Sequence, residues 1–214
     1  GMMVRHVRSG RMLPLNRSLQ FLGQERTLVE EAFPGDVVGL WDPGLLRIGD
    51  TLCEGEPIQY AGVPRFSPEM FVRVRMIDPS RRKQLKAGLE QLSEEGTVQL
   101  FFDCHSMERE PVLGAVGQLQ FEVTRHRLQS EYGVSVIFEP LPATCARWVE
   151  GPDIDLGRLE HPPNTICLLD VAGRPLVMFK GDWDLRMAVK KFPELDFIAA
   201  VQPGRRTRTS RRGG

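Results

Sequence analysis

The sequence has no long apolar run and no net charge. No stretch approaches the ~20 apolar residues of a transmembrane helix, and the charged segment from Met2 to Met12 lacks the apolar core of a signal peptide. Its 214 residues, with 28 basic and 28 acidic side chains and 41% hydrophobic content, form an ordinary globular mixture. We therefore expect one or two cytoplasmic domains that do not enter a membrane.

Metal-binding motifs are also missing. The four histidines are dispersed, and no two of the four cysteines have the Cys-x-x-Cys spacing, at Cys53, Cys104, Cys145 and Cys167. Because metal sites usually draw on ligands at short spacings, we predict reduced cysteines and no metal. Cys104 and His105 are adjacent, but neighbouring strand residues point to opposite faces, which argues against a nucleophile–base pair.

Nucleotide-binding motifs are missing as well. The chain has no Gly-x-x-x-x-Gly-Lys-Ser/Thr loop to hold phosphates and no Asn-Lys-x-Asp motif to bind a base. Residues 170–173 imitate the Asp-x-x-Gly element of GTPases, but so short a motif recurs by chance, and we interpret residues 170–174 as a hairpin turn. A phosphate site of the acylphosphatase kind is disfavoured because Asp78 opens the first helix and would repel an anion. We predict no cofactor and no enzymatic activity in this chain.

Residues 69–140 carry the most informative pattern. A β-rich run, residues 70–76, precedes Asp78 and Pro79, which suit the N-cap and the first position of a helix. An apolar stripe at helical spacing follows, with Gly96 as its stop, at Leu85, Gly88, Leu89 and Leu92. Strands at 98–102 and 111–116, a helix at 117–133 and a strand at 134–138 complete a β-α-β-β-α-β order. This order is the ferredoxin-like motif, so we predict an α+β fold.

The flanking segments are less regular. Residues 1–62 show short β-rich runs, such as 37–41, between Gly and Pro turns, and they predict a partial small β-barrel with Trp41 in its core. Residues 61–68 are the best linker candidate. After residue 140 a second small α/β segment is expected over 143–202, with a helix at 183–192 that Asp182 caps and Pro193 stops. Large side chains within the α/β region are expected to be core: Met70, Met76, Phe101, Phe102, Phe121, Phe138 and Trp148.

Basic side chains on the first strand and the two helices of the 69–140 motif form a candidate nucleic-acid surface. They are Arg73, Arg75, Arg81, Arg82, Lys83, Arg125 and Arg127. Spacing alone favours the alternative that they are solvated or pair with nearby glutamates. Five more arginines lie among the last ten residues. We expect residues 203–214 to be a disordered basic tail, with an accessory RNA contact as the alternative.

Several longer runs of residues are similar to a known family. Residues 89–96, 114–121 and 130–134 resemble the third domain of translational GTPases. Residues 143–150, 29–40 and 48–52 further resemble the class II bacterial peptide chain release factors, known as release factor three. The resemblance extends from about residue 4 to about residue 201 and covers only the C-terminal part of that family's chain, without the GTP-binding domain.

The resemblance implies a function and a domain organisation. Residues 1–62 would be the end of a translation-factor β-barrel whose missing strands leave edges open to self-association. Residues 63–202 would be the C-terminal α/β domain, and the basic surface would contact ribosomal RNA and protein. The full-length family binds GTP and magnesium and promotes departure of class I release factors in translation termination. An elongation factor G-like or ribosome-protection protein is the alternative within the class, and a stand-alone protein-interaction module is the alternative outside it.

Overall fold

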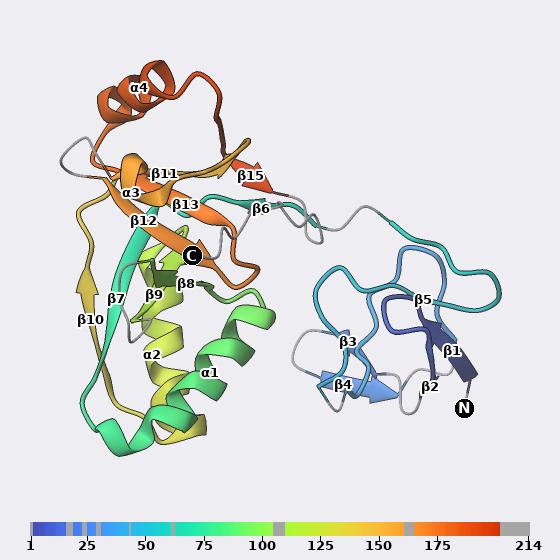
Figure 1. Cartoon of the computed structure of the whole chain (residues 1–214). Helices are drawn as coiled ribbons and strands as arrows, with labels where there is room; N and C mark the ends of the chain where they lie inside the picture. The colour runs from blue at the N-terminus through green and yellow to red at the C-terminus, as the bar shows by residue number, and fades with distance from the viewer. Residues whose placement is uncertain are drawn as a thin grey trace. The chain divides into compact units, whose positions relative to one another are not determined.

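In a computed structural model of the protein, the described residues are 2–15, 19–22, 25–28, 31–42, 44–60, 63–104, 110–160 and 165–201. The chain packs as two compact units, Gly1–Val63 and Pro64–Gly214, and each is described by itself (Figure 1). The predicted basic tail at 203–214 lies outside the described residues.

The first unit contains short antiparallel strands. One sheet has the order β2-β1-β5, and a separate hairpin joins the other two strands; the bounds are β1 Met2–His6, β2 Arg11–Leu15, β3 Leu19–Leu22, β4 Glu25–Leu28 and β5 Leu52–Cys53. The strand predicted at 37–41 is wrong, because only Gly39 makes a single bridge there. Trp41 is 75% exposed and not in a core as predicted.

The first half of the second unit has the predicted element order. After β6 (Arg65–Phe66), the elements are β7 Met70–Met76, the 3₁₀ turn η1 Pro79–Arg81, α1 Arg82–Glu94, β8 Gln99–Asp103, β9 Pro111–Ala115, α2 Gln118–Tyr132 and β10 Val136–Pro140. The strands pair antiparallel in the order β10-β7-β9-β8. This is the ferredoxin-like arrangement, and the α+β prediction is confirmed.

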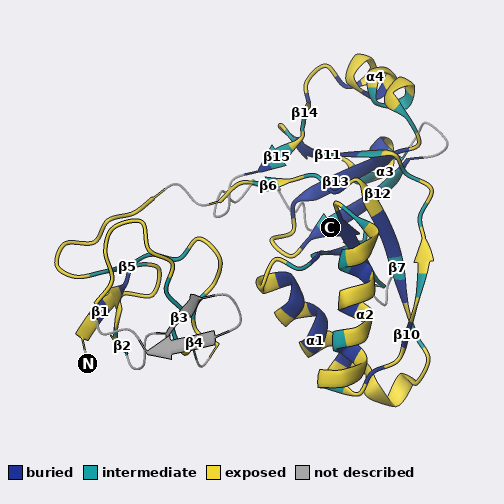
Figure 2. Ribbon diagram, turned by 180° about the vertical axis from the view of Figure 1, so that it is seen from behind, coloured by how far each residue is buried: buried dark blue, intermediate teal, exposed yellow. Residues whose placement is uncertain are grey.

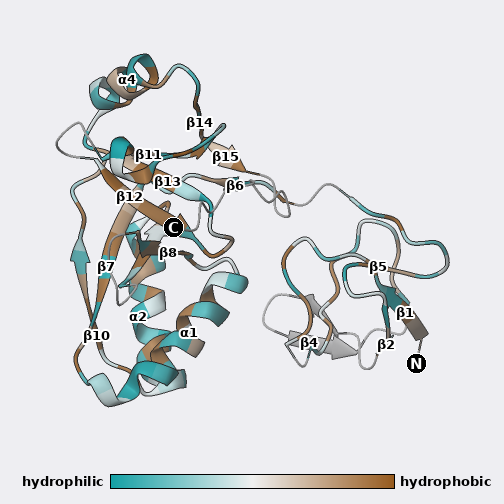
Figure 3. Ribbon diagram, viewed as in Figure 1, coloured by the Kyte–Doolittle hydropathy of each residue, from teal (hydrophilic) through white to brown (hydrophobic). Residues whose placement is uncertain are grey.

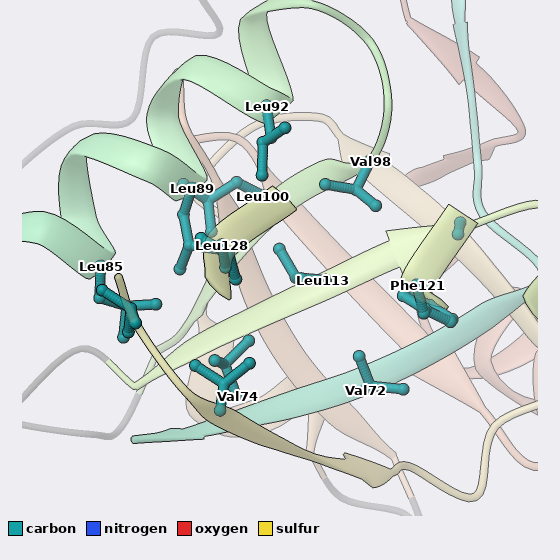
Figure 4. Packing of buried hydrophobic residues seen from close by; sticks show 13 residues of the cluster. Val72, Val74, Leu85, Leu89, Leu92, Val98, Leu100, Leu113, Phe121 and Leu128 are labelled. Atoms are coloured by element: carbon teal, nitrogen blue, oxygen red, sulfur yellow. The ribbon is translucent and has the colours of Figure 1, made fainter. Parts of the chain in front are cut away.

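Helix α1 forms for the reasons that its sequence indicates. The Asp78 carboxylate accepts the backbone N–H of Ser80 at 2.9 Å, and Pro79 follows it. The predicted stripe is buried, with Leu89 2% and Leu92 0% exposed. Gly96, at φ +75°, lies just past the helix end. The stripe packs on α2 and on the sheet, among the side chains that Figure 4 shows.

Gly88 allows α1 and α2 to approach closely. A Cβ atom at this position would lie 2.8 Å from Leu128 Cδ2 and 3.0 Å from Tyr132 Cγ. Real Cβ atoms do not come so close, so even alanine would push the helices apart or displace both side chains. The tight contact fixes the position of α1 against α2.

The second half of the unit repeats the same motif, which the sequence did not reveal. Its elements are β11 Cys145–Glu150, α3 Leu156–Leu159, β12 Ile166–Asp170, β13 Pro175–Phe179, α4 Asp182–Lys191 and β14 Asp196–Ile198. The antiparallel order β12-β13-β11-β14 is again ferredoxin-like. One detail of the prediction changes: Gly181 is the N-cap of α4, and Asp182 is its first residue.

The two motifs join edge to edge. Strands β8 and β12 pair antiparallel, with Leu169 opposite Phe102, and this seam produces one eight-stranded sheet. Its order is β10-β7-β9-β8-β12-β13-β11-β14. From the outer edge of the sheet to the seam, each half therefore has its fourth, first, third and second strand in that order. Helices α1 and α2 cover one half, and α3 and α4 cover the other (Figure 1).

The helix-free faces of the two halves share a core. Phe101 on β8 lies 6.5 Å from Trp148 on β11, measured between ring centroids. These strands are three positions apart in the sheet, which would be about 14 Å in a flat sheet with strands ~4.8 Å apart. The sheet must therefore curl so that its helix-free faces meet, and Figure 3 shows apolar colour on β11, β12 and β13. Phe71, Val112 and Met178 belong to the same core.

The predicted core residues are mostly confirmed. Phe101, Phe121 and Trp148 are buried, Met76, Phe102 and Phe138 pack against the first core while partly exposed, but Met70 is 39% exposed. A short strand, β15 (Ala200–Val201), pairs with β6 and so brings the end of the described chain back to the start of the unit. No helix within the described ranges has the length and apolarity needed to span a lipid bilayer.

Candidate nucleic-acid interface

The seven predicted basic residues lie on β7, at the start of α1 and on α2, and the structure separates them into two groups. Arg73, Arg75 and Arg127 each contact two carboxylates. The others lie at or near the beginning of α1 or on the outer side of α2, where exposed residues face solvent (Figure 2).

The β7 arginines belong to an alternating chain of charges on the helix-free side of the sheet. Arg73 contacts Asp103 at 3.3 Å and Glu110 at 3.1 Å. Arg75 contacts Glu110 at 3.1 Å and Glu139 at 3.0 Å. Two positive charges thus lie among three negative ones, and a phosphate approaching them would meet a net negative surface.

Arg127 is held in the same way between the two helices. It donates to both oxygens of Glu131, at 2.6 and 2.9 Å, and it also contacts Glu95 just after the end of α1. These hydrogen bonds raise the pKa of Arg127 and lower the pKa of both glutamates. The group therefore links α1 to α2 and carries a net negative charge.

The beginning of α1 is different. Arg81, Arg82 and Lys83 are exposed, and Arg81 Nε lies 4.0 Å from the Asp78 carboxylate, at the outer limit of an ion pair. Three cations near a helix N-terminus oppose the helix dipole, so helix stability does not explain them. Arg81 also lies beside the end of α2, since its Nη1 atom is 3.8 Å from the Cβ position of Gly133. Carbonyl groups at that helix end favour a cation.

Arg125 lines a shallow depression on the outer side of α2. The depression has a volume of about 380 Å³, and its other lining residues include His126, Gln129 and Ser135. The backbone N–H of Ile77, just before α1, donates to Ser135 at 3.3 Å. The depression therefore extends from Arg125, at the middle of α2, toward the end of the sheet near which α1 begins.

The turn between β12 and β13 explains the GTPase-like residues. Asp170 Oδ1 accepts the backbone N–H groups of Ala172 and Arg174, each at 2.9 Å, and Oδ2 accepts Arg174 Nε at 2.8 Å. Asp170 is only 5% exposed. The predicted hairpin turn is confirmed, and the aspartate is fully used in forming it.

One cluster was missed at the sequence level. Cys104, Glu160 and Cys167 place their ligand atoms within 4.8 Å of one another. They come from the end of β8, the end of α3 and β12, and only the pairing of β8 with β12 brings them together. A hydrogen bond from Cys104 and burial raise the pKa of the Cys167 thiol. No local spacing signals such a cluster, because it depends on contacts between distant strands.

Comparisons with known proteins follow the division into two units. Residues 60–189 match the family model described as "Class II release factor RF3, C-terminal domain". Residues 1–55 match the model described as "Elongation factor G domain 2". The chain belongs to the class II release factor family.

Two curated relatives of this class II release factor chain carry the same name. A "Peptide chain release factor 3" of Symbiobacterium thermophilum is 46% identical over 202 residues, covering 94% of this chain and 38% of the relative. A protein of the same name from Synechococcus elongatus is 45% identical, covering 95% and 37%. A crystal structure from Thermus thermophilus matches 79% of this chain and 27% of that chain, with TM-score 0.53 and 22% identity, and supports the fold alone. The chain spans less than two fifths of the curated relatives.

Proposed function

We propose that this chain is the ribosome-binding C-terminal portion of a class II release factor, which acts in translation termination by promoting the recycling of class I release factors. The observation that carries the proposal is the match of residues 60–189 to the release-factor C-terminal model. The relatives named peptide chain release factor 3 support it, since the similarity covers 94–95% of this chain. The working location would be the cytoplasm.

The proposed domain division has three parts. Residues 1–62 belong to a translation-factor β-barrel. Residues 63–202 are the C-terminal α/β domain, made of 69–140 and 143–202, and residues 203–214 are a basic tail. The two compact units and the two family matches support the first boundary. Strands β2 and β5 flank β1 in the described sheet of the first unit. Such strands can pair with another copy, which is the proposed route to self-association.

The ribosome contact is proposed for the α1 start and for Arg125. An RNA phosphate attracts exposed cations, and Arg81, Arg82 and Lys83 are three successive cations at one exposed site. Arg73, Arg75 and Arg127 remain in the proposed set through their position, but their carboxylate partners make them the weaker contacts. Binding should be steeply salt-dependent, because each neutralised phosphate releases counterions.

No catalysis is proposed for this chain. Neither family match covers a nucleotide-binding domain, and the GTP and magnesium of full-length relatives would belong to a part of the protein outside these residues. The role proposed here is mechanical. The chain would contact the ribosome differently in two states, and differential contact is what shifts an equilibrium between them.

Ribosome pelleting across a salt series tests the proposal. The proteins are the intact chain, the chain cut after Gln202, and the double variant Arg81→Glu with Arg82→Glu. We expect the intact and cut chains to pellet at low salt and the double variant to bind more weakly. Its salt slope should fall by roughly one for each phosphate contact removed.

A matched control distinguishes the loss of a specific binding site from the effect of the changed net charge of the protein. Lys190→Glu with Lys191→Glu makes the same charge change in the last turn of α4. This control should pellet as the intact chain does, with circular dichroism confirming that all variants are folded. Loss of binding on tail removal alone would move the contact to residues 203–214. Failure of every protein to pellet would favour a stand-alone interaction module instead.

A further inference from the structure

The cluster at the seam between the two ferredoxin-like halves has the composition of a metal site. Cys104 follows β8 directly, Cys167 is the second residue of β12, and Glu160 follows α3 directly. The Cys104 backbone N–H donates to the Cys167 carbonyl at 3.4 Å, which continues the β8–β12 pairing by one step. The two cysteines are therefore cross-strand neighbours with side chains on the α3 side of the sheet.

We propose that Cys104, Cys167 and Glu160 bind one thiophilic divalent cation of the zinc type. The three donor atoms lie within 4.8 Å of one another, and Cys104 Sγ is 3.8 Å from Glu160 Oε1. A tetrahedral zinc with Zn–S bonds of about 2.3 Å holds two sulfurs about 3.8 Å apart and a sulfur and an oxygen about 3.6 Å apart. Only small side-chain movements separate the present arrangement from that geometry.

The surroundings suit a cation that enters from solvent. Cys167 is completely buried, whereas Cys104 and Glu160 are partly exposed and leave a path to the site. The Cys167 backbone N–H, 3.3 Å from Glu160 Oε1, holds the carboxylate toward the sulfurs. Three protein donors leave a fourth position for water, as in zinc sites that are not purely structural.

Glu160 distinguishes a metal site from a disulfide. Two cysteines facing each other across strands could be oxidised to a disulfide, and both are free in the structure. A carboxylate has no part in a disulfide, but it is an ordinary third ligand of zinc beside two thiolates. Because its ligands come from both halves, a bound cation would tie β8 to β12 and stabilise the seam.

Cobalt and zinc titrations of the whole chain provide the test. The protein is treated with a chelator, reduced, and titrated with Co²⁺. We expect one Co²⁺ per chain with a thiolate-to-cobalt charge-transfer band, displaced by one equivalent of Zn²⁺. Absence of that band, or a Cys104–Cys167 disulfide with no cation binding after reduction, would overturn the proposal.

The variants identify the ligands. Losing an outer-shell partner costs a metal site roughly 10–100-fold in affinity, so Cys104→Ser should weaken zinc binding by at least about 100-fold in a chelator competition. Glu160→Gln, which keeps the side-chain volume, should weaken binding and keep the cobalt–thiolate band. Cys145→Ser is the matched control, because Cys145 packs against the same core outside the cluster. Equal zinc affinities in Cys104→Ser and Cys145→Ser would contradict the assignment.

Discussion

The two units of this chain are stabilised by different kinds of interaction. In the first unit, only Val4 and His6 are buried among the side chains that the structure describes. The second unit contains three apolar clusters, two beneath helices and one between helix-free faces. Apolar burial is not directional and tolerates relaxation, whereas a polar centre depends on a few specific hydrogen bonds.

The polar centre of the first unit is Asp50. Its Oδ2 atom is 2.8 Å from His6 Nε2 and accepts the Arg47 backbone N–H at 2.8 Å, while Arg8 donates to both carboxylate oxygens. Ser9 Oγ lies 2.8 Å from the other ring nitrogen of His6. The network joins β1 to the turn before β5. Hydrogen bonds from Arg8, above all, hold the pKa of Asp50 far below its ordinary value.

Leu92→Ala should have the largest effect, a loss of ~2–5 kcal/mol in the free energy of unfolding of the second unit. Leu92 is completely buried in the cluster beneath α1, so its truncation leaves a cavity. Denaturant titration with hydrogen exchange measures the change in each unit. Leu119→Ala is the control, because Leu119 on α2 is 69% exposed, and its change should stay within about 0.5 kcal/mol. Equal losses in the two variants would show that α1 is not anchored by this stripe.

Asp50→Asn should destabilise the first unit by about 1–3 kcal/mol, the range for losing hydrogen bonds to a charged group. The same residue makes that unit sensitive to acid. Because its folded pKa is depressed, its contribution to stability is fully present above its unfolded pKa of about 3.9, begins to be lost as pH falls below that value, and disappears only as pH falls through the folded pKa. Hydrogen exchange of residues 2–60 at about pH 3 and about pH 6 measures this loss. If the first unit of the Asp50→Asn variant were still as sensitive to acid, Asp50 would not be the cause of that sensitivity.

Arg127→Met should have the smallest effect, below about 1 kcal/mol. The variant keeps the apolar stem against the helices and removes the ion pairs with Glu95 and Glu131, both of which are partly exposed. Thermal unfolding in low and high salt measures the difference. It should shrink as salt rises, because exposed charges are screened. A loss as large as that of Leu92→Ala would mean that charges, not apolar contacts, hold α1 on α2.

Local signals predicted the first ferredoxin-like half well. The Asp78 cap, the Leu85–Leu92 stripe and Gly96 each specify structure within a few residues, and all three appear as expected. The second half was recognised only as an α/β segment, because α3 has four residues and shows no helical periodicity. The β8–β12 seam pairs strands that are more than 60 residues apart in the sequence, and no local pattern encodes such pairing.

For the candidate interface, too, the sequence predicted local features but not contacts between distant parts of the chain. The sequence identified the basic residues and placed Arg73 and Arg75 on the first strand of the motif. It could not assign partners, because Glu110 and Glu139 reach them from two other parts of the chain. The pair of cysteines escaped notice for the same reason. Charge patterns along a sequence show where cations are, and the fold decides which carboxylates lie beside them.

The pairing of the two halves through β8 and β12 affects how the chain folds while the ribosome synthesises it. The first motif is complete at Pro140, yet the pairing edge of β8 and the apolar face around Phe71 and Phe101 have no cover until β12 and β13 follow. A nascent chain stopped at that point would present an open strand edge beside exposed aromatic rings, the features that recruit chaperones or other nascent chains. The last pairing of the unit, between β15 and β6, forms only when Val201 lies opposite Arg65. Vectorial synthesis therefore makes this domain most vulnerable midway through its own translation.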